Sequence, residues 1–272
     1  MRLSCQGPAL TVALGAALLG LVAGNGYAAD KVDPIAKARA LYNERNFEGA
    51  VAAAEEAKRL QPARADSADL IASRALLEHY RMSGQTDDLS NARTRLRSLS
   101  ADRLDTGERT EWVVGLGELL YFEDSPGAAA QIFDSILVRA YLPPEARERV
   151  IDWWASALDR DAQPRTDFER QGLYQRIRER MRDELASNPG SAAASYWLAA
   201  AARGQGDWRG AWDAVQAGWV LASLAPDRGV ALRGDLERLM QLAILPARAR
   251  AQAQPAETLR AEWEAFKARW GE

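Results

Sequence analysis

Residues 188–226 read NPGSAAASYWLAAAARGQGDWRGAWDAVQAGWVLASLAP, and this stretch predicts a hairpin of two helices. The pair Pro189-Gly190 precedes a helix of small residues, and the glycine-rich segment 204–207 forms the turn. The second helix then places apolar side chains on one face of a 3.6-residue period: Trp208, Ala211, Trp212, Val215 and Trp219. A single hairpin cannot bury such a face, so neighbouring hairpins must stack on it.

The intervals within this hairpin resemble the tetratricopeptide repeat. The first helix has Leu198-Ala199, the second opens with Trp208 and Ala211, and Gly218 follows seven residues later. A second match lies near the beginning of the chain, where Phe47, Ala50 and Ala57 keep the same intervals and Pro62 follows at the consensus distance. The third hairpin also holds the consensus intervals, with Ser125-Pro126 in place of the usual turn: Leu116-Gly117, Leu120, Ala129, Phe133 and Ile136. Small residues at a helix crossing allow two backbones to approach, and the aromatic ring fills the remaining gap. The resemblance implies an all-α superhelix, and an amphipathic hairpin in another helical fold is the alternative.

The rest of the chain supplies the neighbours that the hairpin requires. Hairpins are expected to begin near residues 34, 64, 107, 144, 189 and 227, at intervals that suit tetratricopeptide-like arrays. The hairpin near 64 lacks the aromatic residue, and Asp87 or Asp88 is expected to cap its second helix. A break is expected from 246 to 255, and residues 255–272 are expected to form a capping helix with an apolar side (Leu259, Trp263, Phe266, Trp270). We therefore predict one continuous solenoid of about six hairpins over residues 30–272.

Residues 1–29 are typical of a signal peptide that is removed on export. Arg2 supplies a short positive segment, residues 9–23 are apolar, and small residues allow cleavage after Ala28 or, nearly as well, after Ala29. The apolar run is short for a membrane span, although an uncleaved anchor is an alternative. Cleavage would remove Cys5, the only cysteine. We expect a mature chain without a transmembrane span, located in the periplasm or secreted.

Composition and charge exclude several classes of function. The formal net charge of −3 in 272 residues gives no electrostatic reason to expect binding to nucleic acid. His79 is the only histidine, so catalytic triads, zinc sites and haem attachment lack their residues. We expect no cofactor, no metal and no enzymatic activity. A hydrolase with two carboxylates, for which Glu118, Glu123 and Asp124 are the candidates, is an alternative.

The nine tryptophans suggest a further alternative. Trp153, Trp208, Trp212 and Trp219 follow helical spacing and are expected in the core. Trp154 and Trp197 deviate from the simplest inward stripe, so they are candidates for a groove that stacks on a sugar or holds a peptide side chain. A glycan- or peptidoglycan-associated binding protein would use such residues.

The tetratricopeptide resemblance implies that a partner lies along the concave face formed by the first helices of the hairpins. The consensus positions carried over to this chain are Arg39, Tyr42 and Asn43 in the first hairpin, Glu118, Tyr121 and Phe122 in the third, and Tyr196, Ala200 and Arg203 in the fifth. We therefore expect a non-catalytic envelope scaffold that binds another envelope protein or peptide segment. The oligomeric state is left open.

Overall fold

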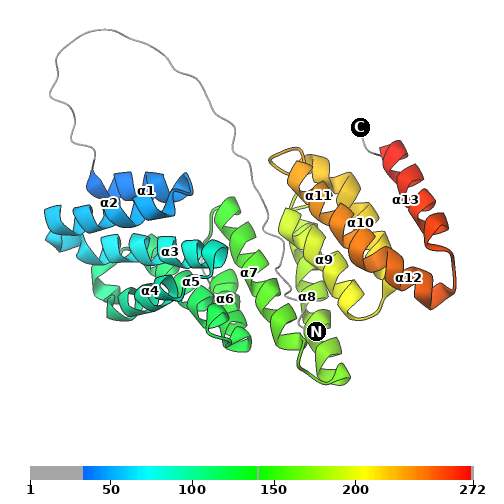
Figure 1. Cartoon of the computed structure of the whole chain (residues 1–272), viewed down its shortest axis with the longest axis horizontal. Coiled ribbons are helices and arrows are strands. Elements are labelled where there is room, and N and C mark those ends of the chain that lie inside the picture. The colour runs from blue at the N-terminus through cyan, green and yellow to red at the C-terminus, as the bar shows by residue number, and fades with distance from the viewer. Residues whose placement is uncertain (1–32, 140, 271–272) are drawn as a thin grey trace, which may run out of the picture. The chain divides into compact units, whose positions relative to one another are not determined.

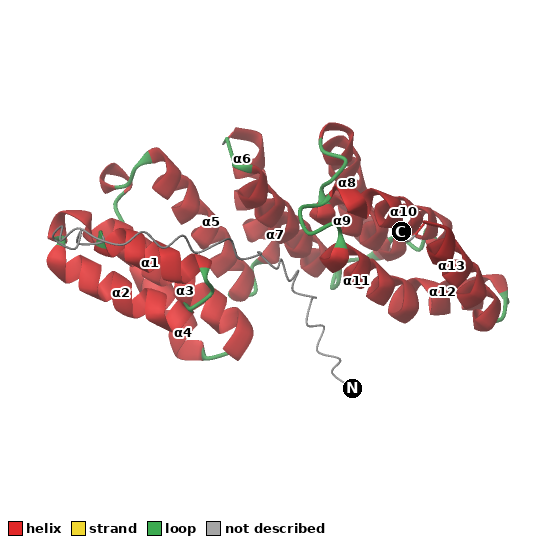
Figure 2. Cartoon of the chain, turned by 90° about the horizontal axis from the view of Figure 1, so that it is seen from above, coloured by secondary structure: helices red, strands yellow, loops and turns green. Residues whose placement is uncertain are grey.

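A computed structural model describes residues 33–139 and 141–270, and all regular structure in this part of the chain is helical (Figures 1 and 2). The all-α prediction is confirmed. The predicted signal peptide and the last two residues of the predicted capping helix lie outside the described residues. None of the described helices is long and apolar enough to cross a membrane. The chain divides into two compact units, with the boundary between Tyr141 and Leu142, and each unit is described by itself.

The N-terminal unit, which ends at Tyr141, contains three consecutive helical hairpins. In chain order its helices are α1 (Pro34–Asn43), α2 (Phe47–Leu60), α3 (Ala65–Ser83), α4 (Thr86–Ser98), α5 (Thr106–Phe122) and α6 (Pro126–Arg139). The first helices of the hairpins pack on one another, α1 on α3 and α3 on α5. Each of the second helices α2 and α4 packs on the first helix of the next hairpin.

The C-terminal unit, which begins at Leu142, repeats this order of packing. Its helices are α7 (Pro144–Ala162), α8 (Asp167–Ser187), α9 (Ala192–Gly204), α10 (Trp208–Leu221), α11 (Val230–Leu239), α12 (Leu245–Gln252) and α13 (Ala256–Trp270). The first helices again pack in sequence, α7 on α9 and α9 on α11. The helices begin close to the six predicted starting points.

The three hairpins that follow the tetratricopeptide intervals share one turn. A residue with positive φ comes two positions before the second helix in each of them: Arg45 (62°), Asp124 (57°) and Gly206 (75°). The next residue donates its backbone N–H to the carbonyl five positions earlier, over 2.9, 2.9 and 3.0 Å. A left-handed residue with this bond is a recognised way to close a helix C-terminus. The repetition in the sequence is therefore also a repetition of backbone geometry.

Side-chain caps fix where the helices of the matching hairpins start. Asp33 accepts a hydrogen bond from the backbone N–H of Ile35 at 3.2 Å, and Pro34 occupies the first helical position. Asn46 caps α2 and Asp207 caps α10 through the backbone N–H groups of residues three positions on. These bonds satisfy N–H groups that have no partner within the helix.

One local prediction is wrong, and another holds only in part. Helix α4 begins at Thr86 without a side-chain cap, and Asp88 instead accepts a hydrogen bond or ion pair from His79 Nδ1 at 2.7 Å. The expected break from 246 to 255 is found only at 253–255, because α12 continues to Gln252 and a π-helical turn (Met240–Ile244) joins it to α11. Proline lacks an N–H, and a wider turn accommodates the missing hydrogen bond.

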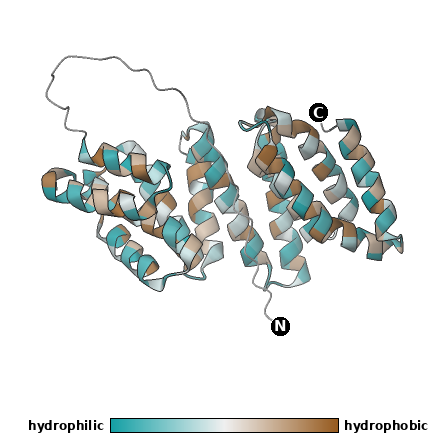
Figure 3. Ribbon diagram, turned by 45° about the horizontal axis from the view of Figure 1, so that its top comes forward, coloured by the Kyte–Doolittle hydropathy of each residue, from teal (hydrophilic) through white to brown (hydrophobic). Residues whose placement is uncertain are grey.

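Small and aromatic residues fill the core of both units. The alanines at the matching position of the three hairpins, Ala50, Ala129 and Ala211, are fully buried, as close helix crossing requires. In the C-terminal unit Trp212, Trp263 and Leu236 belong to one apolar cluster that α13 helps to complete. Figure 3 shows hydrophobic and hydrophilic residues on the same helices, as amphipathic packing requires.

Replacing Gly117 with alanine is expected to lower the free energy of unfolding. A Cβ at this position would lie 2.6 and 2.8 Å from two ring carbons of the fully buried Phe133. Overpacking costs about 1–3 kcal/mol, while alanine returns about 0.5–1 kcal/mol of helix propensity. We expect a net loss of about 1–2 kcal/mol in urea unfolding.

The matched control is Gly172→Ala in α8, where a Cβ would meet nothing within 4 Å. This variant should gain about 0.5–1 kcal/mol. Equal stabilities for the two variants would show that the contact between α5 and α6 has no steric constraint at Gly117.

Candidate functional site

The face formed by the first helices of the N-terminal unit carries a connected group of charges. Arg39 on α1 donates from Nη1 to both carboxylate oxygens of Glu111 at 3.0 and 3.1 Å. Its Nη2 donates to Glu108 Oε1 at 3.2 Å, and both carboxylates belong to α5. Ion-paired, multiple hydrogen bonds of this kind are stronger than neutral ones.

Arg74 on α3 extends this group toward the middle of the face. Its Nη2 donates to Glu118 Oε1 at 3.0 Å and lies 3.5 Å from the hydroxyl of Tyr42. Its Nη1 donates to the backbone carbonyl of Glu111 at 3.1 Å. Burial by itself would lower the pKa of Arg74, but Glu118 and further acidic neighbours outweigh it and raise the pKa. Arg74 is therefore a permanent charge that connects α1, α3 and α5.

Gly115 explains how the Arg74 side chain can cross α5. A Cβ at Gly115 would lie 3.1 Å from Arg74 Cδ. The missing side chain therefore leaves a path for the arginine between the two helices. This glycine had no role in the sequence prediction.

The structure places the predicted contact residues of the N-terminal unit at different depths. Asn43 is exposed and Tyr42 is half-buried beside Phe47. Tyr121 and Phe122 are half-buried, with their rings in edge contact. Glu118 is only 1% exposed, so it lies beneath the face and cannot itself contact a partner. The sequence reasoning expected it on the face because it occupies a consensus position, and the pairing with Arg74 explains its burial.

In the C-terminal unit the predicted residues Tyr196, Ala200 and Arg203 follow one another along α9. Arg203 is exposed, and the other two are half-buried. Burial is the main cause that raises the pKa of Tyr196 from 10.0 to about 12, with Asp235 the largest acidic contribution, followed by Asp152 and Asp159. Carboxylates from both α7 and α11 therefore act on the Tyr196 hydroxyl.

The raised pKa of Tyr196 gives a testable pH dependence. A folded-state pKa above the unfolded value stabilises the protein below pH 10.0, and this contribution is lost as the pH rises through about 12. A titration of tyrosinate absorbance should show a late step near pH 12 that Tyr196→Phe removes. In urea the same tyrosine should titrate near its ordinary value. Identical late steps in the wild type and the variant would contradict the assignment.

The two tryptophans proposed for a ligand groove are buried. Trp154 is 0% exposed and Trp197 is 9% exposed. The Trp197 Nε1 donates to Asp152 Oδ1 at 2.8 Å, and Arg180 stacks 4.8 Å from the centre of the Trp154 ring. The prediction is wrong because α7, which carries Trp154, packs on both α8 and α9. Residues on more than one side of α7 are therefore buried, and α7 also covers α9, which carries Trp197.

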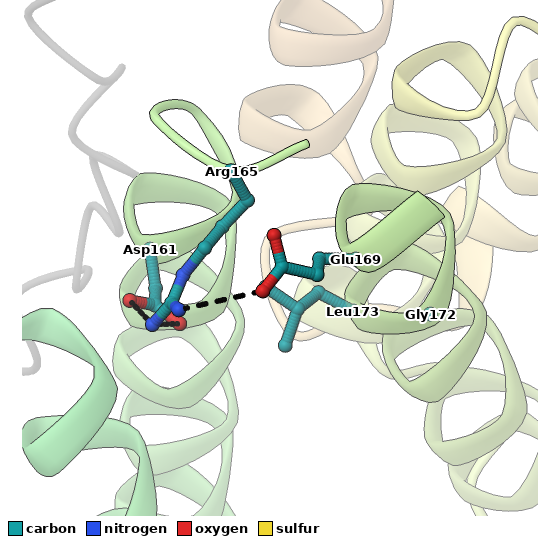
Figure 4. Close-up of a pocket in the computed structure, with 5 residues that line it drawn as sticks. All are labelled: Asp161, Arg165, Glu169, Gly172 and Leu173. Carbon is teal, nitrogen blue, oxygen red and sulfur yellow. Dashed lines mark hydrogen bonds and ion pairs between the residues drawn. The ribbon is translucent and has the colours of Figure 1, made fainter. Parts of the chain in front are cut away.

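An open pocket lies at the turn between α7 and α8, and the charged side chains that line it form ion pairs with one another (Figure 4). Arg165 lies 3.0 Å from Asp161 and 3.9 Å from Glu169, and Gly172 and Leu173 complete the lining. Within the described residues no group of three or more histidine, cysteine or acidic side chains could hold a metal ion. The first-helix face of each unit, taken by itself, is thus a better candidate site than this pocket.

Sequence reasoning missed four residues of these faces: Arg74, Glu108, Glu111 and Asp152. Glu111 and Glu118 are seven residues apart on one side of α5, so periodicity could have found Glu111. Arg74 belongs to the hairpin that departs from the consensus, and no interval marks it. Its partners are 32 to 44 residues away in the chain, beyond the reach of local pattern.

Comparison with known proteins gives no match: no family model, no curated protein and no solved structure is similar to this chain. The resemblance to the tetratricopeptide repeat therefore depends on the residues and the geometry described above.

Proposed function

We propose that this chain is an exported, non-catalytic scaffold whose hairpins form a tetratricopeptide-like solenoid, and that its first-helix faces bind another envelope protein. The observation that carries the proposal is the shared turn of the three matching hairpins, together with the successive packing of first helices in each unit. Repeated hairpins joined in this way create extended binding surfaces.

The side chains on these faces suit an extended peptide segment. Tyrosine supplies apolar area with one polar group, and the flanking charges fix the direction of a bound chain. Tyr42 and Asn43 lie on α1, and Tyr196 and Arg203 lie on α9. A short segment could use aromatic contacts for affinity and the charged groups for selection.

The two alternatives have less support. The glycan hypothesis requires Trp154 and Trp197 at the surface, and both are buried. The hydrolase hypothesis names Glu118 and Glu123, which pair with Arg74 and Arg93. Glu118 is also only 1% exposed, so a substrate could not reach its carboxylate.

Site-specific photocrosslinking tests the assigned faces. A photoreactive amino acid at Asn43 or Arg203, both exposed on first helices, should crosslink to an envelope protein in native extract. The same probe at Ala52 on α2 or Arg209 on α10, both exposed on second helices, should not. Replacing Tyr42, Tyr121 and Tyr196 with alanine should abolish the specific adduct. Equal crosslinking from first and second helices would refute the face assignment.

Export has a separate test. The intact mass of the protein from the envelope fraction should correspond to a chain that begins at Ala29 or Asp30. A full-length mass in the membrane fraction would instead support the anchor.

A further inference from the structure

We propose that Arg39, Glu108 and Glu111 form an ionic clasp that holds α1 toward α5 and keeps the first-helix face of the N-terminal unit narrow. Releasing the clasp widens the face. This inference concerns the N-terminal unit alone and requires no partner.

The clasp joins two helices that do not belong to the same hairpin. Helix α1 packs on α2 and α3, and α3 packs on α5 (Figure 1). Arg39 reaches past α3 to carboxylates 69 and 72 residues later in the chain. It makes three hydrogen bonds there, at 3.0, 3.1 and 3.2 Å. A change in these bonds therefore acts directly on the separation of α1 and α5.

The apolar contacts of α1 are directed elsewhere. Only Ile35 and Ala38 are buried in this ten-residue helix, and they belong to a cluster with residues of α2 and α3. Few buried apolar contacts are typical of segments with low local stability. The core thus fixes α1 on its own hairpin and on α3, whereas the clasp links α1 directly to α5; Arg74 of α3 links the two helices only indirectly, through the Tyr42 hydroxyl and Glu118.

The two carboxylates of the clasp differ: Glu108 is held in place by the protein, whereas Glu111 can be replaced by another anion. The Glu108 side chain is 6% exposed and also accepts a hydrogen bond from the backbone N–H of Asp105 at 3.2 Å, so it is anchored in the turn that starts α5. The Glu111 side chain is 44% exposed and Arg39 is 35% exposed. Solvent ions, or a carboxylate on a bound chain, can compete for Arg39 from the exposed side.

Spin-label distances test the clasp in the full chain. With Cys5→Ser, labels at Ala36→Cys on α1 and Thr106→Cys on α5 occupy exposed positions and report the separation of the two helices. Arg39→Gln should shift the distance distribution to longer values and broaden it. Raising the salt to about 1 M, where the Debye length is about 3 Å, should shift the wild type in the same direction.

A matched control separates the clasp from a general loss of charge. Lys37→Gln removes a cation from the same helix, but its partner Glu56 lies on α2 at 3.8 Å, so the distribution should stay as in the wild type. Glu111→Gln keeps the bond to Glu108 and should give a smaller shift than Arg39→Gln. If Arg39→Gln does not fold, by circular dichroism, Glu111→Gln decides the question. Wild-type distances in a folded variant would overturn the clasp and leave the proposed function untouched.

Discussion

Trp263→Ala is expected to lower the free energy of unfolding of the C-terminal unit by about 3–5 kcal/mol, the usual cost of deleting a large aromatic side chain from a core. Trp263 on α13 is 0% exposed. Its ring centre lies 6.3 Å from that of Trp212, 5.2 Å from Trp219 and 5.6 Å from Phe266. The substitution therefore removes several aromatic contacts at once and leaves a cavity.

A polar contact adds to this cost. The Trp263 Nε1 donates to Glu237 Oε2 at 2.8 Å, and Lys267 pairs with the same oxygen at 3.1 Å. Alanine removes the donor and the ring beside which Lys267 lies. Helix α13 would then keep Leu259 and Phe266 as its buried residues, too little apolar surface to hold fifteen residues firmly.

Urea unfolding followed by circular dichroism measures the loss, and hydrogen exchange localises it to α13. The control is Trp270→Ala on the same helix, which is 51% exposed and should change stability by less than about 0.5 kcal/mol. If both variants lose the same free energy, α13 does not depend on Trp263 for its attachment.

Arg74→Met is expected to cost the N-terminal unit about 3–5 kcal/mol, because it breaks a buried ion pair by removing one partner. The Arg74 side chain is 12% exposed and that of Glu118 is 2% exposed. Methionine retains much of the arginine stem but takes the guanidinium away from Glu118, from the Glu111 carbonyl and from the neighbourhood of Tyr42. The buried Glu118 carboxylate would then lack the guanidinium that stabilises its charge, and the folded state would be destabilised.

The double variant Arg74→Met/Glu118→Met tests the cause. Replacing both partners with apolar residues of similar size is often neutral, so the double variant should recover most of the loss in a double-mutant cycle. Arg103→Met is the control, since Arg103 is 71% exposed and lies 3.6 Å from Asp66, which also accepts a hydrogen bond from the backbone N–H of Ser100; a cation this exposed contributes about 0–1 kcal/mol to its ion pair. A double variant as unstable as Arg74→Met would show that packing, and not charge, accounts for the effect.

Site residues whose positions depend on spacing within one helix could be predicted, whereas those whose burial depends on another hairpin could not. Tyr42, Asn43 and Arg203 could be assigned to first helices from spacing, and the structure places all three on α1 and α9. Glu118 was assigned by the same spacing, but it is buried and forms an ion pair with Arg74 of another hairpin. Consensus spacing specifies which helix face a residue occupies and gives no information about which residue of a neighbouring helix covers it.

The sequence by itself determined the helical class, the points where the hairpins begin and the turns of the matching hairpins. These depend on groups a few residues apart, such as the cap from Asp207 to Gly210 and the backbone bond from Asn46 to Leu41. Only the tertiary structure decided which tryptophans are buried and which charges are paired. Trp154 is enclosed because α7 has neighbours on two sides, and Arg39 meets Glu111 across 72 residues of chain. The physical reason is that hydrogen bonds within a turn are fixed by local backbone geometry, whereas burial and ion pairing depend on which helices pack together.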